Sequence, residues 1–148
     1  MPIRTHYQIT ETRLDPERLV AQVRDPSVGA VATFIGTARN SFQGKAVRYL
    51  EYEAYAPMAE RSLAEIGTEI ANRWPEIVGL AIEHRVGRLE IGEASVIVVV
   101  AAPHRREALA ACGYAIDRLK QTLPVWKREV FADGSVWREN VIEGGELN

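Results

Sequence analysis

Apolar residues follow two different periods along this chain, and segments of the two kinds alternate. Five of them recur every three or four positions: Ala59, Leu63, Ile66, Ile70 and Trp74. This spacing predicts a helix that begins near Pro57 and ends before Pro75. A shorter helix is predicted from Asp15-Pro16 to about Val23, because aspartate caps helix starts and proline suits the first helical position. A third helix is predicted by a similar stripe: Leu109, Cys112, Ile116 and Leu119.

Short apolar or alternating runs between these helices predict strands. Residues 95–102 (SVIVVVAA) are continuously apolar, which is typical of a strand covered on both faces. Residues 29–35 (GAVATFI) predict a second buried strand. Alternation predicts further strands at residues 3–9, 46–55, 78–82, 125–131 and 135–141, the last two joined by a turn at Asp133-Gly134. Residues 36–44 and 87–92 carry glycine at both ends and are predicted to be a polar loop and a turn-rich segment.

The order of these elements indicates the fold class. Strands and helices are mixed and several turns have hairpin length, which favours an α+β fold with mixed or antiparallel sheets and flanking helices over a parallel doubly wound fold. We expect residues 1–148 to form a single domain, since this length can bury a core without disulfides. The tail at residues 143–148 is predicted to be loose.

Composition excludes several classes of function. Hydrophobic residues make up 47% of the chain, charged residues 26%, and the pI is near 6.0, so a general nucleic-acid-binding protein is not expected. No run of about 18 apolar residues predicts a membrane span, and the N-terminus lacks the apolar core of a signal peptide. A single cysteine, Cys112, suits the reducing cytoplasm.

The charge is unevenly distributed. Residues 104–129 hold six Lys or Arg and three Asp or Glu, a local charge of +3 in a chain whose net charge is −2. Such a local field attracts compact anions more than long polyanions. Lys120 and Lys127 lie seven residues apart with Pro124 between them, so they belong to different elements, as the walls of a pocket do.

Two further cationic segments follow predicted buried strands. His104 and Arg105 precede a helix, whose N-terminal N–H groups favour anions. Arg39, in the sequence Gly36-Thr37-Ala38-Arg39-Asn40, follows another strand, where glycine allows close approach and Thr and Arg can donate to phosphate. The alternative for each segment is a cation that only solvates a loop or a helix start.

The two lysines have both structural and chemical interpretations. Lys120 ends a helix, where the dipole favours a cation in any case. Lys127 could be an edge-strand charge that blocks aggregation. Held near other cations and partly desolvated, however, Lys127 would have a lowered pKa and could transfer protons or act as a nucleophile. Cys112 lies on the apolar stripe of its helix and is interpreted as a core residue, and the scattered histidines indicate no metal site.

With these motifs the chain resembles the large, catalytic subunit of molybdopterin synthase, from about Gly29 to Asn140. The motifs that carry the resemblance are Gly36-Thr37-Ala38-Arg39-Asn40, His84-Arg85-Val86-Gly87, Pro103-His104-Arg105, Leu119-Lys120 and Pro124-Val125-Trp126-Lys127-Arg128-Glu129. The resemblance implies an α/β-hammerhead fold and a homodimer within a heterotetramer. It also implies a reaction without a cofactor, in which a small ubiquitin-like sulfur carrier donates sulfur from its C-terminal Gly-Gly thiocarboxylate to cyclic pyranopterin monophosphate, forming the dithiolene of molybdopterin.

The resemblance also implies roles for particular residues. Lys120 matches the catalytic lysine and Lys127 its companion, whereas Ile116 replaces a methionine of some relatives. The implied substrate-binding set is Thr37, Ala38, Arg39, His104, Arg105, Lys120, Lys127, Arg128 and Glu129. A helix from about residue 106 to Lys120 is roughly 22 Å long, so its two ends cannot touch one pterin unless two copies of the chain share a site.

The carrier's tail is expected to approach the lysines, pairing along residues 125–131 or a nearby loop. Two other functions stay open at this stage. One is a non-catalytic module that binds a phosphorylated metabolite or a partner's tail, which would not need both lysines. The other is a different phosphoryl- or acyl-transfer enzyme, for which a glycine-rich loop or a paired Ser or Cys nucleophile would be expected.

Overall fold

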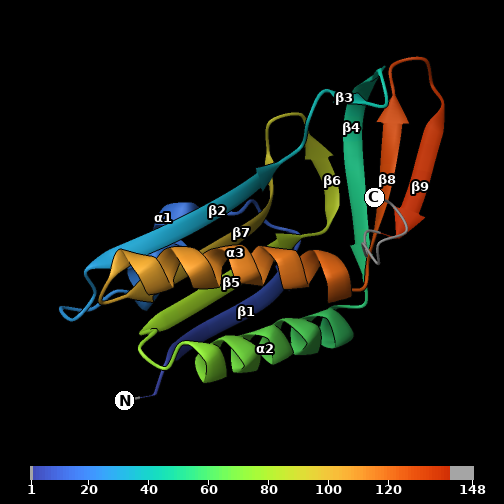
Figure 1. The fold of residues 1–148 in the computed structure, drawn as a ribbon. Coiled ribbons are helices and arrows are strands. Elements are labelled where there is room, and N and C mark those ends of the chain that lie inside the picture. The colour runs from blue at the N-terminus through green and yellow to red at the C-terminus, as the bar shows by residue number, and fades with distance from the viewer. Residues whose placement is uncertain (1, 141–148) are drawn as a thin grey trace.

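The computed structural model describes residues 2–140, which form two sheets and three helices (Figure 1). The helices are α1 (Pro16–Val23), α2 (Ala56–Arg73) and α3 (Arg105–Thr122). The strands are β1 (Arg4–Thr10), β2 (Ala30–Thr37), β3 (Ser41–Phe42), β4 (Lys45–Ala54), β5 (Gly79–Arg85), β6 (Gly87–Glu90), β7 (Ala94–Ala102), β8 (Val125–Phe131) and β9 (Val136–Asn140).

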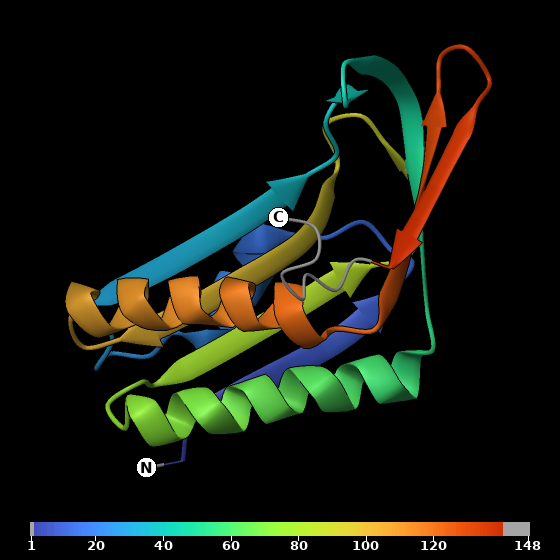
Figure 2. The same ribbon diagram turned by 45° about the vertical axis from the view of Figure 1, so that its right-hand side comes forward.

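The first sheet has the order β1-β5-β7-β2. β1 and β5 run parallel, whereas β5, β7 and β2 pair antiparallel. Helices α2 and α3 lie side by side on one face of this sheet, and α1 covers the other face (Figures 1 and 2). The sheet is therefore the middle layer of three.

The second sheet projects from one end of the first, as the strands at the right of Figures 1 and 2 show. Its order is β3-β4-β8-β9, with β6 also paired to β4. The long strand β4 thus organises this sheet, since it pairs with β3, β6 and β8. The short turn between β8 and β9 contains Gly134 at a φ of 89°, a conformation that suits glycine.

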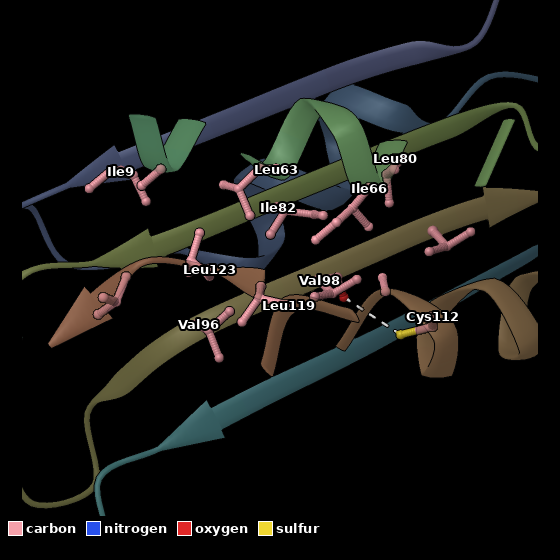
Figure 3. Packing of buried hydrophobic residues seen from close by; sticks show 14 of the residues in the cluster. Ile9, Leu63, Ile66, Leu80, Ile82, Val96, Val98, Cys112, Leu119 and Leu123 are labelled. Carbon is pink, nitrogen blue, oxygen red and sulfur yellow. Dashed lines mark hydrogen bonds between the residues drawn. The ribbon is translucent and has the colours of Figure 1, made fainter. Parts of the chain in front are cut away.

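The main core lies between the first sheet and helices α2 and α3 (Figure 3). Leu63 and Ile66 of α2 pack there with Ile82 of β5 and Val98 of β7. The alternate residues of β7 face α1, where a second cluster forms: Leu14, Leu19, Val23, Ala81, Ile97, Val99 and Ala101. Strand β7 is covered on both faces, as its continuous apolar run predicts.

The fold class and the three helices are confirmed. In α1, Asp15 is the N-cap and its side chain accepts hydrogen bonds from the backbone N–H groups of Glu17 and Arg18. Helix α2 begins at Ala56, within one residue of the predicted start, and ends at Arg73, directly before Trp74 and Pro75. The predicted loose tail at residues 143–148 lies outside the described residues, and no helix within residues 2–140 has the length and apolar character needed to cross a membrane.

Four local predictions need correction. The predicted polar loop contains β3, and the predicted turn-rich segment contains β6, because both short strands gain hydrogen bonds from β4. Strand β2 is half exposed, with Ile35 44% accessible, since it is an edge strand. On α3, Leu109 is 63% exposed. The buried face of α3 is made of smaller residues instead, which let the helix lie close to the sheet: Ala108, Ala111, Cys112, Ala115 and Leu119.

Candidate active site

A cavity of about 180 Å³ lies where the first sheet, the C-terminal end of α3 and the second sheet meet. Its walls come from β2 and β7 on one side and from β4 and β8 on the other. Five of the predicted site residues line it: Thr37, Arg39, Lys120, Lys127 and Glu129. The two lysines therefore reach one space from a helix end and from a strand, as predicted from the proline between them.

Lys127 is held by two carboxylates. Its Nζ lies 3.1 Å from Oε2 of Glu129 and 3.1 Å from Oε2 of Glu139. Its side chain is only 17% exposed, and the ammonium lies 5.2 Å from the centroid of the Phe42 ring. Glu129 is itself 4% exposed, so this group of charges is largely removed from water. A partly buried ion pair of this kind restricts the position of Lys127 and favours its charged form.

The pKa of Lys127 is shifted in the direction opposite to the sequence-based prediction. Burial alone would lower the pKa of its ammonium. The charge of Glu129, with smaller contributions from Tyr52 and Glu139, outweighs burial and raises that pKa above its ordinary value. The prediction was wrong because it considered the neighbouring cations and not the two carboxylates, Glu129 on the same strand and Glu139 on the paired strand β9. Lys127 is thus cationic at neutral pH, suited to holding an anion rather than to accepting a proton.

The opposite wall of the cavity comes from the end of β2. Gly36 and Thr37 are its last two residues, and Arg39 follows in the connection to β3. A side chain at Gly36 would bring a Cβ within 2.9 Å of a Val96 methyl carbon, so glycine permits the close packing of β2 on β7 here. Arg39 thus enters the cavity from a chain segment anchored between two paired strands.

The other predicted site residues lie elsewhere in this chain. Ala38 is 3% exposed, and its backbone pairs with Glu93 and Gly92. Arg128 points to the opposite face of β8 and forms an ion pair with Glu51 of β4. His104 and Arg105 lie at the N-terminal end of α3, beside a separate open hollow of about 670 Å³. One chain therefore brings together only part of the predicted set.

Two neighbours of Lys127 on the adjacent strands were missed from sequence: Tyr52 of β4, which lines the cavity, and Glu139 of β9, which forms an ion pair with Lys127. Tyr52 is 8% exposed, and burial raises the pKa of its hydroxyl, which the charge of Lys127 partly offsets. Both residues are register partners of Lys127: Tyr52 pairs with it from β4, and Glu139 pairs with it from β9. The turn predicted at Asp133-Gly134 gave the hairpin but not its exact register, because counting outward from those two residues pairs Lys127 with Asn140, whereas the strands pair Lys127 with Glu139.

The remaining predictions concern sulfur and metal chemistry. Cys112 is 7% exposed, its Sγ lies 4.0 Å from the Val98 carbonyl oxygen (Figure 3), and burial raises the pKa of its thiol to about 11. It is a core residue, as predicted. Within residues 2–140, no three His, Cys, Asp or Glu side chains gather as a metal-binding group would require.

The fold and the cavity define an α/β-hammerhead protein whose cationic site is suited to a small anionic molecule. The MoaE protein family matches residues 9–122 of the chain. The molybdopterin synthase catalytic subunit of Bacillus subtilis (strain 168) is 46% identical over 137 residues, which cover 93% of this chain and 87% of that protein. The chain belongs to the MoaE protein family.

Solved structures agree with this assignment. The X-ray structure of molybdopterin synthase from Staphylococcus aureus matches with a TM-score of 0.86 at 38% identity, over 90% of this chain and 96% of that one. A complex of subunits 1 and 2 of molybdopterin-converting factor from Helicobacter pylori 26695 matches with a TM-score of 0.72 over 97% of both chains. At 20% identity, that second likeness concerns the fold alone.

Proposed function

We propose that this chain is the catalytic subunit of a molybdopterin synthase and works in the cytoplasm. It transfers sulfur from the C-terminal thiocarboxylate of a small ubiquitin-like carrier to cyclic pyranopterin monophosphate. The observation that carries the proposal is the single cavity lined by Lys120, Lys127 and Arg39. A non-catalytic module would need one cation to hold an anion, and would not need two lysines delivered to one space by different elements.

The surroundings of the two lysines support different roles. Lys127 is fixed and cationic between Glu129 and Glu139, so we assign it to holding the anionic substrate or the charge that develops during transfer. Lys120 comes from the last turn of α3 and lines the same cavity. We assign Lys120 to proton transfer or to stabilising the acyl intermediate as sulfur leaves the carrier.

The proposed site needs a second copy of the chain. A cavity of about 180 Å³ is smaller than the ~300–1,000 Å³ typical of small-molecule sites. His104 and Arg105 lie some 22 Å from Lys120 along α3, at 1.5 Å per residue. Edge strand β2 exposes Ile35, and helix α3 exposes Leu109. We propose that a two-fold homodimer covers them and brings His104 and Arg105 of one subunit to the lysine cavity of the other.

Of the two approaches expected for the carrier's tail, the nearby loop fits the structure better than pairing along residues 125–131. Strand β8 pairs with β4 on one side and with β9 on the other, so residues 125–131 offer no free edge to an added strand. The connection around Arg39 is the nearby loop that remains. We propose that the Gly-Gly tail enters beside it, with a carrier subunit on each outer end of the dimer. The two-subunit complex from Helicobacter pylori, which has the same fold, supports a heteromeric assembly.

The decisive experiment is to incubate the purified chain with thiocarboxylated carrier and cyclic pyranopterin monophosphate and to measure dithiolene product. A carrier ending in an ordinary carboxylate is the matched control, because it binds through the same tail but brings no sulfur. Product should form only with the thiocarboxylate, and a carrier lacking the terminal glycines should be inactive. Absence of product with a verified thiocarboxylated carrier would overturn the proposal.

A further inference from the structure

His84 is a buried histidine to which the proposed reaction gives no role. It lies near the end of β5, in the middle of the first sheet, and only 5% of it is exposed. Its ring packs edge-on against Tyr52, with 5.0 Å between the ring centroids. Tyr52 belongs to the second sheet, so His84 is located where the two sheets and the end of α3 meet.

The hydrogen bond of His84 defines which ring nitrogen carries the proton. Nδ1 lies 2.8 Å from the backbone carbonyl oxygen of Arg85. A carbonyl oxygen can only accept, so Nδ1 is the donor. Burial lowers the pKa of His84 to about 4, the hydrogen bond to Arg85 opposes this, and the charge of Lys120 lowers it further. At neutral pH the ring is therefore uncharged, and Nε2 is left with a lone pair that can accept a hydrogen bond.

A small cavity connects His84 with the lysine site. Its volume is about 10 Å³, and it is lined by Tyr52, His84, Ser95, Leu119, Lys120 and Leu123. Three of these residues, Tyr52, Ser95 and Lys120, also line the main cavity. The space behind Lys120 is close to the lower limit of roughly 10–15 Å³ for one water molecule. The imidazole and the Lys120 side chain thus share a wall and a space that can hold a single bridging water.

We propose that His84 is a positioning residue for Lys120. Its Nε2 accepts a hydrogen bond from the Lys120 ammonium, directly or through one water in the small cavity, and this draws Nζ to the inner end of the active site. The proposal deepens the proposed function, since it rests on the assignment of Lys120 as the catalytic lysine. An uncharged acceptor suits this task, because it orients the ammonium without the full ion pair that restrains Lys127.

Two substitutions separate positioning from mere filling of space. His84→Asn keeps an amide N–H near Nδ1 but has no acceptor at the place of Nε2. His84→Gln is longer and can present its amide oxygen near that place. Thermal unfolding of both variants shows whether each retains the fold.

NMR of the lysine side chains tests the contact between His84 and Lys120 directly. The chain has three lysines, Lys45, Lys120 and Lys127, so protein labelled only at lysine gives three side-chain Nζ signals. Lys45→Arg and Lys127→Arg assign them. The charged groups around the cavity are Arg39 from the β2–β3 connection and Lys127 and Glu129 from β8, with the ionisable Tyr52 from β4. The Lys127 signal, which is held by its own carboxylates, is the internal control.

In His84→Asn we expect the Lys120 signal to move and its titration midpoint to fall by roughly one unit, as loss of a hydrogen bond to a charged group produces. The kcat of sulfur transfer should fall about 10-fold with little change in KM, since misplacing a reacting group affects the reaction more than binding. His84→Gln should restore most of both, and Lys127 should not shift. Equal effects in Asn and Gln variants, or an unmoved Lys120 signal in both, would overturn the positioning role. A wild-type chain without activity whose Lys120 signal still responds to His84→Asn would reject the sulfur transfer and keep the contact.

Discussion

The two ends of α3 both carry basic residues, yet their surroundings differ. At the C-terminal end, Lys120 enters a cavity of about 180 Å³ closed by two sheets, with Lys127 and two carboxylates opposite. At the N-terminal end, His104 and Arg105 border an open hollow of about 670 Å³ beside exposed Leu109. Basic side chains thus line a cavity at the C-terminal end of α3 and border an open surface hollow at its N-terminal end. The difference agrees with our proposal that His104 and Arg105 of one copy complete the lysine cavity of another.

The largest expected effect tests the C-terminal end of α3, where Lys120 lines the cavity. Lys120→Ala should lower the rate of sulfur transfer by roughly 10²–10⁴-fold, the usual contribution of acid–base help. The fold should be unchanged, because Lys120 is not one of the buried core residues of α3. Lys45→Ala is the matched control, since the ammonium of Lys45 lies outside the cavity in an ion pair with Asp133. Activity of Lys120→Ala within about twofold of wild type would remove the difference between the two ends.

A pair of leucines on α3 compares the packing of the two ends. Leu119 is 3% exposed, whereas Leu109 is 63% exposed. Leu119→Ala should lower the free energy of unfolding by about 2–5 kcal/mol, as buried leucine truncations do. Leu109→Ala should change the unfolding of the monomer by less than about 0.5 kcal/mol, as exposed positions do. Urea unfolding measures both, and sedimentation measures the dimer. A Leu109→Ala chain with an unweakened dimer would argue against the proposed interface.

His84, which lies beside the C-terminal end of α3, makes the stability of the folded protein depend on pH. Its pKa is about 4 in the folded protein against 6.5 ordinarily, so below pH 6.5 the unfolded chain binds a proton that the folded chain refuses. Stability from this group is therefore full above pH 6.5 and is lost as pH falls towards 4. The loss is on the order of 3 kcal/mol. Unfolding of wild type and His84→Asn should be measured from pH 7 to 4, where the wild-type curve should fall more steeply. Parallel curves would contradict a buried neutral imidazole.

The smallest expected effect is a partial restoration, and it tests whether the two ends meet across a dimer. Arg105→Ala and Lys120→Ala chains should each be inactive alone. After subunit exchange, half of the dimers are mixed and each has one intact site, so about a quarter of wild-type activity should return. Activity is measured before and after exchange. Mixtures as inactive as their parents would place the whole site within one chain.

Short-range patterns in the sequence were enough for much of the fold. The cap at Asp15, the apolar stripe of α2 and the apolar run of β7 each depend on contacts within a few residues, and each element lies where it was predicted. The short strands β3 and β6 were missed for the converse reason. They consist of two and four residues and exist because β4, distant in the sequence, supplies their hydrogen bonds. Leu109 was misplaced because a helical stripe does not show which of its residues reach the sheet.

The same division holds for the candidate site. By itself the sequence determined that Lys120 and Lys127 belong to different elements, since a proline between them ends the helix, and that Cys112 lies on an apolar helix face. Only the tertiary structure decided the charge state of Lys127, because Glu129 and Glu139 approach it through side-chain alternation and strand pairing. It also placed Arg128 on the far face of β8 and His84 behind Lys120. Charge and period are properties of the chain, whereas distance and burial arise when remote segments pack.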